Sequence, residues 1–212
     1  MRIIRVLLLS LWLPVAYPAM QHGRMFMDET GMIMNANPDR LPSDCPQISE
    51  EVNLTVRAGS QHAAQLPGSM FAFEPRNWAV KGCAKINLTF INDDNIRHQL
   101  MIHGLPGYLY PDGMMHLELY GKGQLSASLI VPSRPKTYLV HCELPLHMEK
   151  GMKAQLQVAG GDGDLPSIPG LTGPARPDRY PLTWGRSAWL GLALAFALGL
   201  SPLAWLNRPS HD

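Results

Sequence analysis

The chain has 212 residues, enough for one domain or two small ones, and its 18 Lys and Arg against 17 Asp and Glu leave a formal net charge of +1. This near-neutral balance provides no basic field, so we expect no nucleic-acid partner. The small number of charges and the two apolar ends instead indicate export and a membrane.

Residues 1–19 have the pattern of a secretory signal segment. A short charged head leads into the apolar run Val6–Val15, and small residues follow up to Ala19. An apolar run of this length suits a signal better than a membrane span, which needs about 20 apolar residues. Because Tyr17 is a poor residue ahead of a cleavage point, an uncleaved signal anchor is the alternative.

Residues 20–46 are rich in methionine and follow neither a helical period nor a sustained alternation, so they predict a flexible arm. The soft ligands of this arm are His22, Met25, Met27, Met32 and Met34. Thioethers select cuprous copper, and the paired methionines suit transient Cu(I) binding. Alternatively, the same methionines pack over the domain, because thioethers fill irregular gaps well.

Residues 47–160 predict an all-β domain. Short alternating apolar runs are separated by Gly, Pro and Asp clusters, which is typical of a β-sandwich. The predicted strands are Val52–Arg57, Trp78–Val80, Lys85–Asn92, Arg97–His103, His116–Tyr120, Gln124–Val131, Lys136–Cys142 and Met152–Val158. A compact sandwich of this size holds side chains from distant strands in fixed positions.

Of the three cysteines, Cys45 lies in the segment just ahead of the first predicted strand, and Cys83 lies at the start of a later strand. Cysteines of an exported domain are more often bridged than free. We therefore predict a disulfide that ties the base of the arm to the sandwich, with two separate buried thiols as the alternative.

The third cysteine lies in the stretch YLVHCELPLHMEKGM, directly after a predicted strand. Cys142 is followed five residues later by His147 and five further on by Met152, while His98 follows the β-branched run INLTFIN. One thiolate, two imidazoles and a weak axial thioether form the ligand set of a type 1 copper site. Zinc also takes Cys and His ligands, but a thioether is a poor ligand for zinc, so the methionine favours one copper ion. A buried thiol among core histidines is the purely structural alternative.

The stretch HCELPLHMEKGM resembles the type 1 copper loop of multicopper oxidases, and His98 and His103 match the first and last positions of the family's H-P-x-H-x-H motif. The segment FAFEPRNWAVKGCAKINLTFIND is similar to the early strands of cupredoxins. The resemblance runs from Val52 to Ala159 and implies a cupredoxin-like Greek-key β-sandwich. The chain also resembles small periplasmic cupredoxins of copper-tolerant bacteria, which carry Met-rich N-terminal segments.

The same resemblance argues against oxygen reduction by four electrons. The trinuclear cluster of the oxidases is bound by H-x-H pairs, and this chain contains no H-x-H. Met101 holds the middle position of the upstream motif, and Glu143 holds the position after the cysteine. We therefore expect an electron-transfer or copper-binding protein more than an enzyme.

A second copper site is suggested by a likeness to copper nitrite reductases, in which the positions of His103 and His141 bind the catalytic copper. The accessory ligand set would be His103, His141, Met101, Glu143 and His116. The alternative is that the two histidines are hydrogen-bonded inside the sandwich, as buried polar groups usually are.

The C-terminal part of the chain predicts a tether and an anchor. Residues 161–186 are thick with Gly and Pro, which makes them a partly extended linker. Residues 187–206 carry no charge, and as a helix they span about 30 Å, one hydrocarbon thickness. We predict a transmembrane helix there, with 207–212 as a cytoplasmic tail; a buried globular helix is the alternative, although little is left for it to pack against.

These features predict a mononuclear type 1 copper protein on the periplasmic side of the bacterial inner membrane, anchored by one C-terminal transmembrane helix. Its expected partners are copper ions and a periplasmic or membrane redox protein. The expected role is copper tolerance or homeostasis with one-electron transfer. A dedicated relay to a respiratory redox partner and a weak cuprous oxidase are the alternatives.

Overall fold

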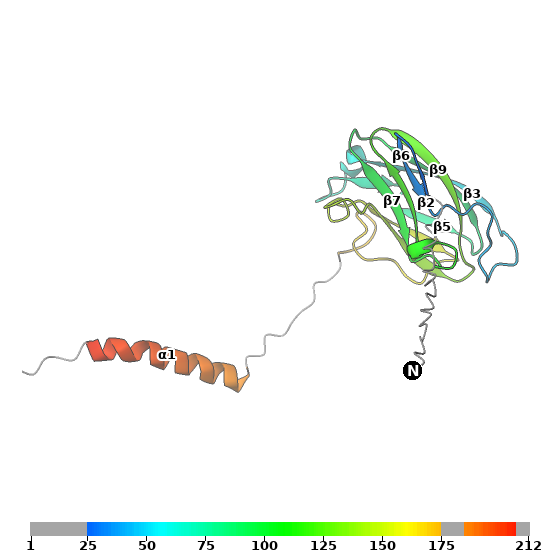
Figure 1. Ribbon diagram of the computed structural model, residues 1–212. Helices are drawn as coiled ribbons and strands as arrows, with labels where there is room; N and C mark the ends of the chain where they lie inside the picture. Colours follow the sequence, from blue (N-terminus) through cyan, green and yellow to red (C-terminus); the bar gives the residue numbers. More distant parts are fainter. Residues whose placement is uncertain (1–24, 175–184, 207–212) are drawn as a thin grey trace, which may run out of the picture. The chain divides into compact units, whose positions relative to one another are not determined.

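The computed structural model describes residues 25–174 and 185–206 (Figure 1). The chain divides into two compact units, Met1–Ala175 and Arg176–Asp212. The predicted signal segment at 1–19, the arm residue His22, positions 175–184 of the predicted linker and the predicted tail at 207–212 lie outside the described residues.

The first unit is mostly β and contains two sheets, which confirms the predicted β architecture at this level. The seven-stranded sheet has the order β1-β2-β8-β7-β10-β11-β5 and the four-stranded sheet the order β4-β3-β6-β9. The strands are β1 Met25–Met27, β2 Gly31–Met34, β3 Glu51–Gly59, β4 Ala72–Glu74, β5 Asn77–Val80, β6 Lys85–Asn92, β7 His98–His103, β8 Met114–Leu119, β9 Gly123–Ile130, β10 Lys136–His141 and β11 Lys153–Val158. Two short 3-10 helices, η1 Ser60–Ala63 and η2 Pro111–Gly113, lie between strands.

The core lies between the inward faces of the two sheets. Strand β6 shows the cause, since Ile86, Leu88 and Phe90 alternate with partly exposed neighbours and are themselves buried. From the other sheet, Leu100 and Ile102 of β7 join the same cluster. Each such side chain contributes about 1.5–3 kcal/mol when fully buried, so period-two patterning of this kind specifies which face of each strand turns inward.

Strand pairing places two distant segments at one end of the seven-stranded sheet. Strand β7 lies between β8 and β10 and is antiparallel to both, with Met101 opposite His141 and Ile102 opposite Val140. Because β10 runs antiparallel to β7, the start of β7 at His98 lies near the end of β10. The residue after β10 is Cys142, which the fold thereby brings toward His98.

The flexible arm predicted for residues 20–46 is wrong for its described part. Strand β2 pairs with β8, with Ile33 opposite Leu117 and Met34 opposite His116, and β1 pairs with β2. The Asn35 side chain donates hydrogen bonds to the carbonyls of Pro111 and Met114. This strand could not be predicted from the sequence GMIM, because apolar residues occupy both of its faces. Apolar and polar residues therefore do not alternate along it.

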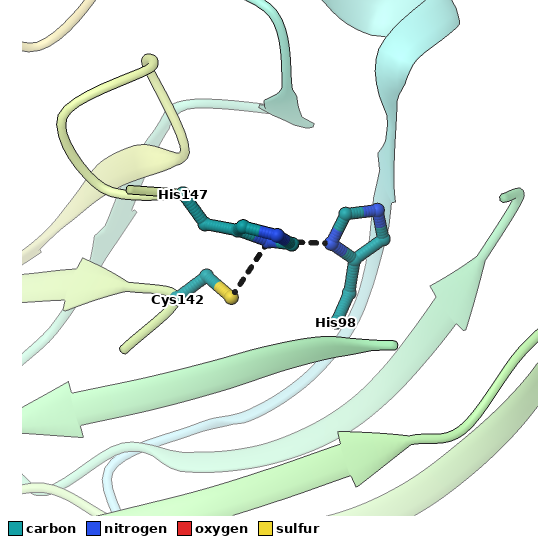
Figure 2. Close-up of side chains that lie close together, drawn as sticks. All are labelled: His98, Cys142 and His147. Atoms are coloured by element: carbon teal, nitrogen blue, oxygen red, sulfur yellow. Dashed lines mark hydrogen bonds between the residues drawn. The ribbon is translucent and has the colours of Figure 1, made fainter. Parts of the chain in front are cut away.

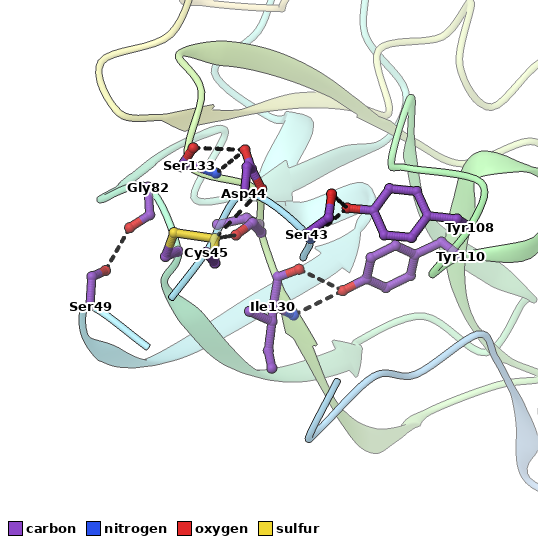
Figure 3. Close-up of a disulfide and its surroundings, with 11 residues drawn as sticks. Ser43, Asp44, Cys45, Ser49, Gly82, Tyr108, Tyr110, Ile130 and Ser133 are labelled. Atoms are coloured by element: carbon purple, nitrogen blue, oxygen red, sulfur yellow. Dashed lines mark hydrogen bonds between the residues drawn. A yellow bond between two sulfur atoms is a disulfide. The ribbon is translucent and has the colours of Figure 1, made fainter. Parts of the chain in front are cut away.

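The predicted disulfide between Cys45 and Cys83 is confirmed (Figure 3). Close to it, Asp44 accepts hydrogen bonds from the backbone N–H and the hydroxyl of Ser133, and Ser49 donates to the carbonyl of Gly82 (Figure 3). A bridge that closes a loop of 38 residues stabilises the fold by about 3–4 kcal/mol in the chain-entropy model.

A tyrosine ties the same region to β9. The Tyr110 hydroxyl donates to the carbonyl of Ile130 at 2.7 Å and accepts from its N–H at 2.9 Å (Figure 3). The Asn37 side chain donates to the same hydroxyl at 3.1 Å. The segment that precedes β3 is therefore an ordered part of the sandwich.

The second unit contains one helix, α1, at Arg186–Leu206, which covers the segment predicted to cross a membrane. Within the part of the chain that the structure describes, no helix combines the length and apolarity that crossing a membrane requires.

Candidate metal centre

Three side chains from separate segments converge at one end of the sandwich. The donor atoms of His98, Cys142 and His147 all lie within 4.8 Å of one another. Nδ1 of His98 lies 3.2 Å from Nδ1 of His147, which in turn lies 3.4 Å from Sγ of Cys142 (Figure 2). His98 and Cys142 are fully buried, whereas His147 is half-buried. The fold thus assembles one sulfur and two nitrogen donors in one enclosed place.

The loop from Cys142 to Met152 closes on itself through backbone hydrogen bonds. The N–H of Cys142 donates to the carbonyl of Met152 at 3.2 Å, and the N–H of Met152 donates to the carbonyl of His147 at 3.0 Å. Met152 is fully buried. The backbone of Met152 is therefore bonded to both of the other loop residues in the predicted ligand set.

Gly151 makes this closure sterically feasible. Its φ is +104°, and a Cβ at this position would lie 2.4 Å from Oγ of Ser69. Both the left-handed backbone and the close approach favour glycine. A side chain here would push the end of the loop away from the segment that precedes β4.

His98 is oriented by a carboxylate on its far side. Nε2 of His98 lies 2.9 Å from Oδ2 of Asp94, and Asp94 also accepts hydrogen bonds from the N–H and the hydroxyl of Ser60. Burial alone would raise the pKa of Asp94, but the hydrogen bonds from His98 and Ser60 outweigh it and lower that pKa. An ionised Asp94 accepts a hydrogen bond from the Nε2–H of His98, which leaves the Nδ1 lone pair facing Cys142 and His147.

The protonation states suit a metal ion. Burial lowers the pKa of His98 despite the opposing effect of Asp94, and burial followed by the charge of His98 lowers the pKa of His147. Burial raises the pKa of the Cys142 thiol, although the N–H of Gln99, 3.4 Å from its sulfur, acts in the opposite direction. The imidazoles are therefore neutral at pH 7, and a bound metal would displace the thiol proton.

The half-buried side of the centre is apolar. The Phe71 ring stacks on the His147 ring at 4.5 Å between centroids and meets the His98 ring edge-on at 5.2 Å. Of the three loop residues directly before His147, Leu146 is 65% exposed, Pro145 is exposed and Leu144 packs partly against the core.

Sequence reasoning did not identify Asp94, Ser60 or Phe71. A signal for Asp94 was present, since a carboxylate four residues before a candidate ligand is a plausible orienting partner. Ser60 and Phe71 lie 38 and 27 positions before His98 in the chain (98 − 60 and 98 − 71), and their role depends on the pairing of β3 with β4 and β6.

The predicted accessory ligands lie on the opposite face of the seven-stranded sheet. Met101 and His103 alternate with the core residues of β7, and the His103 ring stacks on the His141 ring at 4.8 Å. Glu143 is exposed. In residues 25–174 and 185–206, the set of His, Cys, Asp and Glu donors that converges closely is His98, Cys142 and His147, so these residues form no second compact cluster.

The hydrogen bonding expected for these two histidines is incomplete. Nε2 of His103 and Nδ1 of His141 are buried and have no hydrogen-bond partner. The His141 ring does form a hydrogen bond with the backbone of Cys142, so one nitrogen of that ring is satisfied and the other is not.

Solved structures similar to this chain include two auracyanins and a multicopper oxidase. An auracyanin from the photosynthetic bacterium Roseiflexus castenholzii is 19% identical, with 53% of this chain and 98% of that chain covered and a TM-score of 0.39. Auracyanin A, a blue copper protein from Chloroflexus aurantiacus, is 19% identical over 50% of this chain and 98% of that chain, with a TM-score of 0.38. A multicopper oxidase from Pediococcus acidilactici is 17% identical over 58% of this chain and 27% of that chain, with a TM-score of 0.37.

Auracyanins and multicopper oxidases are thus among the solved structures to which this chain is similar. No protein-family model matches the sequence, and no curated protein matches it significantly.

Proposed function

We propose that this chain binds one copper ion in a type 1 site formed by His98, Cys142, His147 and Met152, and that it exchanges single electrons there. The observation that carries the proposal is the convergence of two Nδ1 atoms and one Sγ at a buried position. This donor set fits copper because thiolate and imidazole ligands suit it, and copper bound there would supply the Cu(I)/Cu(II) couple.

The surrounding residues hold the ligands in place. Asp94 fixes the orientation and the tautomer of His98, and Gln99 donates a backbone hydrogen bond to the sulfur of Cys142. Phe71 restricts the His147 ring by stacking on it. A site whose ligands are fixed by such neighbours needs little rearrangement when its charge changes.

For the physiological role we propose copper tolerance or homeostasis outside the cytoplasm. The support is the methionine-rich hairpin of β1 and β2, whose thioethers suit Cu(I), together with the signal-like residues 1–19. We further propose that residues 187–206 anchor the protein in the bacterial inner membrane with the sandwich on the periplasmic side, because these twenty residues carry no charge.

A dedicated electron relay is the second candidate, and the apolar surface beside His147 favours it. Leu146 and Met70 are exposed there at 65% and 56%, and Phe71 connects this surface to the ligand ring. Small apolar contacts suit weak and short-lived encounters with a redox partner. A weak cuprous oxidase activity would require Cu(I) turnover with oxygen that depends on Cys142.

The centre is tested by the colour of the full chain loaded with Cu(II). We expect a strong visible charge-transfer band that disappears in Cys142→Ser, because the band requires the thiolate. Met70→Leu is the matched control and should keep the band. An identical spectrum in Cys142→Ser and the unchanged chain would refute the proposed site.

The two physiological roles are separated by deletion of the gene. Copper tolerance predicts that the deletion strain becomes sensitive to copper while respiration is unaffected. Loss of growth on one respiratory electron acceptor without copper sensitivity would instead support the relay.

A further inference from the structure

Soft ligands form a straight row across the outer face of the seven-stranded sheet. Strand register places Met25 opposite Met34, Met34 opposite His116, His116 opposite Met101 and Met101 opposite His141. Directly opposed residues on neighbouring strands project to the same face. We call these five residues the outer-face row. Met101, His116 and His141 face away from the core, because their sequence neighbours Leu100, Leu117 and Val140 belong to the core. Met34 and Met25 share this face through the strand register.

The inner part of the row is buried and carries unsatisfied nitrogen atoms. His116, Met101 and His141 are 5%, 2% and 8% exposed. In the described residues, Nε2 of His116 and Nδ1 of His141 are buried without a hydrogen-bond partner, and Glu118 lies 3.6 Å from Nε2 of His116, beyond hydrogen-bond range. Leaving such groups unsatisfied costs about 1–3 kcal/mol each, so their presence calls for an explanation.

Both carboxylate oxygens of Glu118 already interact with side chains other than His116. Its Oε2 accepts a hydrogen bond from the Gln99 side chain at 2.7 Å, and Arg97 lies 3.3 Å from its other oxygen. Burial lowers the pKa of His116, so its imidazole is neutral at pH 7 with a lone pair available to a metal ion.

The spacing along the row allows a shared metal ion. Neighbouring strands lie about 4.8 Å apart, so His116 and His141, with Met101 between them, are separated by about 10 Å at their backbones. Two imidazoles with metal–nitrogen bonds of about 2 Å can meet across that gap by side-chain rotation. The thioether of Met101 then lies beside the ion, and soft thioethers select Cu(I) over harder cations.

We propose that the outer face of the seven-stranded sheet binds one Cu(I) ion through His116, Met101 and His141, separately from the centre at Cys142. Met34 and Met25 continue the row to the sheet edge, where Met25 is 56% exposed. The row thereby provides thioether contacts from solvent to the buried ligands. Before any ion binds, the His141 ring stacks on the ring of His103.

The proposal is tested by titrating the full, metal-free chain with Cu(I) in competition with a chromophoric Cu(I) chelator. We expect His116→Leu to bind one Cu(I) equivalent fewer than the unchanged chain and to keep the visible band of the Cu(II)-loaded protein. Met101→Leu conserves volume and should weaken the same equivalent. The matched controls His62→Gln and Met70→Leu lie outside the row and should bind as the unchanged chain does.

The outcomes separate this proposal from the type 1 site. If His116→Leu and Met101→Leu bind as much Cu(I) as the controls, with equal affinity, the outer-face site does not exist. If the unchanged chain lacks a visible Cu(II) band but His116→Leu still loses one Cu(I) equivalent, the type 1 proposal fails and the outer-face site stands. Circular dichroism of each variant establishes that the sandwich is intact.

Discussion

The two faces of strand β7 carry similar types of metal ligand, but these ligands are held in place by hydrogen bonds on one face only. On the inner face, His98 is hydrogen-bonded to Asp94 and directed at Cys142 and His147. On the outer face, Met101 is buried, and its cross-strand neighbours His116 and His141 each keep a buried nitrogen without a partner. The inner ligands are held in position before any metal binds, whereas the outer ones must turn to reach an ion. This difference suits a fixed redox centre on one face and an adaptable Cu(I) site on the other.

The largest expected effect contrasts neighbours on β7 that face opposite sides. Leu100→Ala should lower the free energy of unfolding by about 3 kcal/mol, because it opens a cavity in the core. Met101→Leu keeps the volume and should cost less than about 1.5 kcal/mol. Urea unfolding of the metal-free chain measures both. Equal losses would mean that the outer face is packed as tightly as the core.

The next effect concerns the orientation of His98. Asp94→Asn should weaken Cu(II) binding about 10- to 100-fold, because the amide no longer holds the Nε2 proton as a carboxylate does. Asp93→Asn is the matched control, since Asp93 interacts with Arg57 and His62 instead of a ligand. Competition titration with a Cu(II) chelator measures both affinities. If the two variants bind equally, Asp94 does not position the ligand.

A smaller effect is expected in the pH dependence of stability. Burial lowers the pKa of His116 below 6.5, although Glu118 and Glu143 act in the opposite direction. As the pH falls below 6.5, the imidazole of His116 is therefore protonated in the unfolded chain before it is protonated in the folded chain. The free energy of unfolding decreases over this range, until the pH reaches the pKa of His116 in the folded chain. The slope contributed by His116 is at most about 1.4 kcal/mol per pH unit.

His116→Leu should remove this part of the slope. Unfolding of the metal-free chain between pH 7 and pH 5 provides the measurement, with His62→Gln as the reference. An unchanged slope in His116→Leu would show that His116 is not buried as a neutral imidazole.

The smallest effect is expected from replacing His141, whose Nδ1 has no hydrogen-bond partner. His141→Phe keeps a ring against His103 and removes the unpartnered Nδ1, so the free energy of unfolding at pH 7 should change by less than about 0.5 kcal/mol or rise. His98→Phe breaks the hydrogen bond to Asp94 and should cost about 1–3 kcal/mol. Similar losses of unfolding free energy in the two variants would show that the histidines on the two faces do not differ in how well they are hydrogen-bonded.

Much of this arrangement could be predicted from local pattern. The bounds of β6 follow from strict alternation, and the spacing of Cys142, His147 and Met152 after a strand indicates the loop of the inner site. The pairing of Cys45 with Cys83 is predicted from the number of cysteines together with the export that the sequence leads us to expect. These are features that neighbouring residues or simple counts specify.

The remainder depends on pairing between distant segments. Strand β4 has three residues, too few to show a period, and β2 is apolar on both faces. The outer-face row exists only because β1, β2, β8, β7 and β10 are neighbours in one register, and a shift of one residue would turn its members into the core. Ser60 reaches Asp94 for the same reason, since β3 and β6 run side by side.

The exposure gradient along the outer-face row has a consequence for oxidative damage. Met25, at the sheet edge, is 56% exposed, whereas Met101 is 2% exposed. Peroxide converts accessible methionines to sulfoxides, which replace a soft sulfur donor with a polar group, and buried methionines react more slowly. The exposed methionines at the sheet edge would thus be oxidised first, and their oxidation would protect the thioether of Met101. If the outer face binds Cu(I) as we propose, the oxidised protein could no longer take up cuprous ions at the sheet edge but would retain those already bound inside.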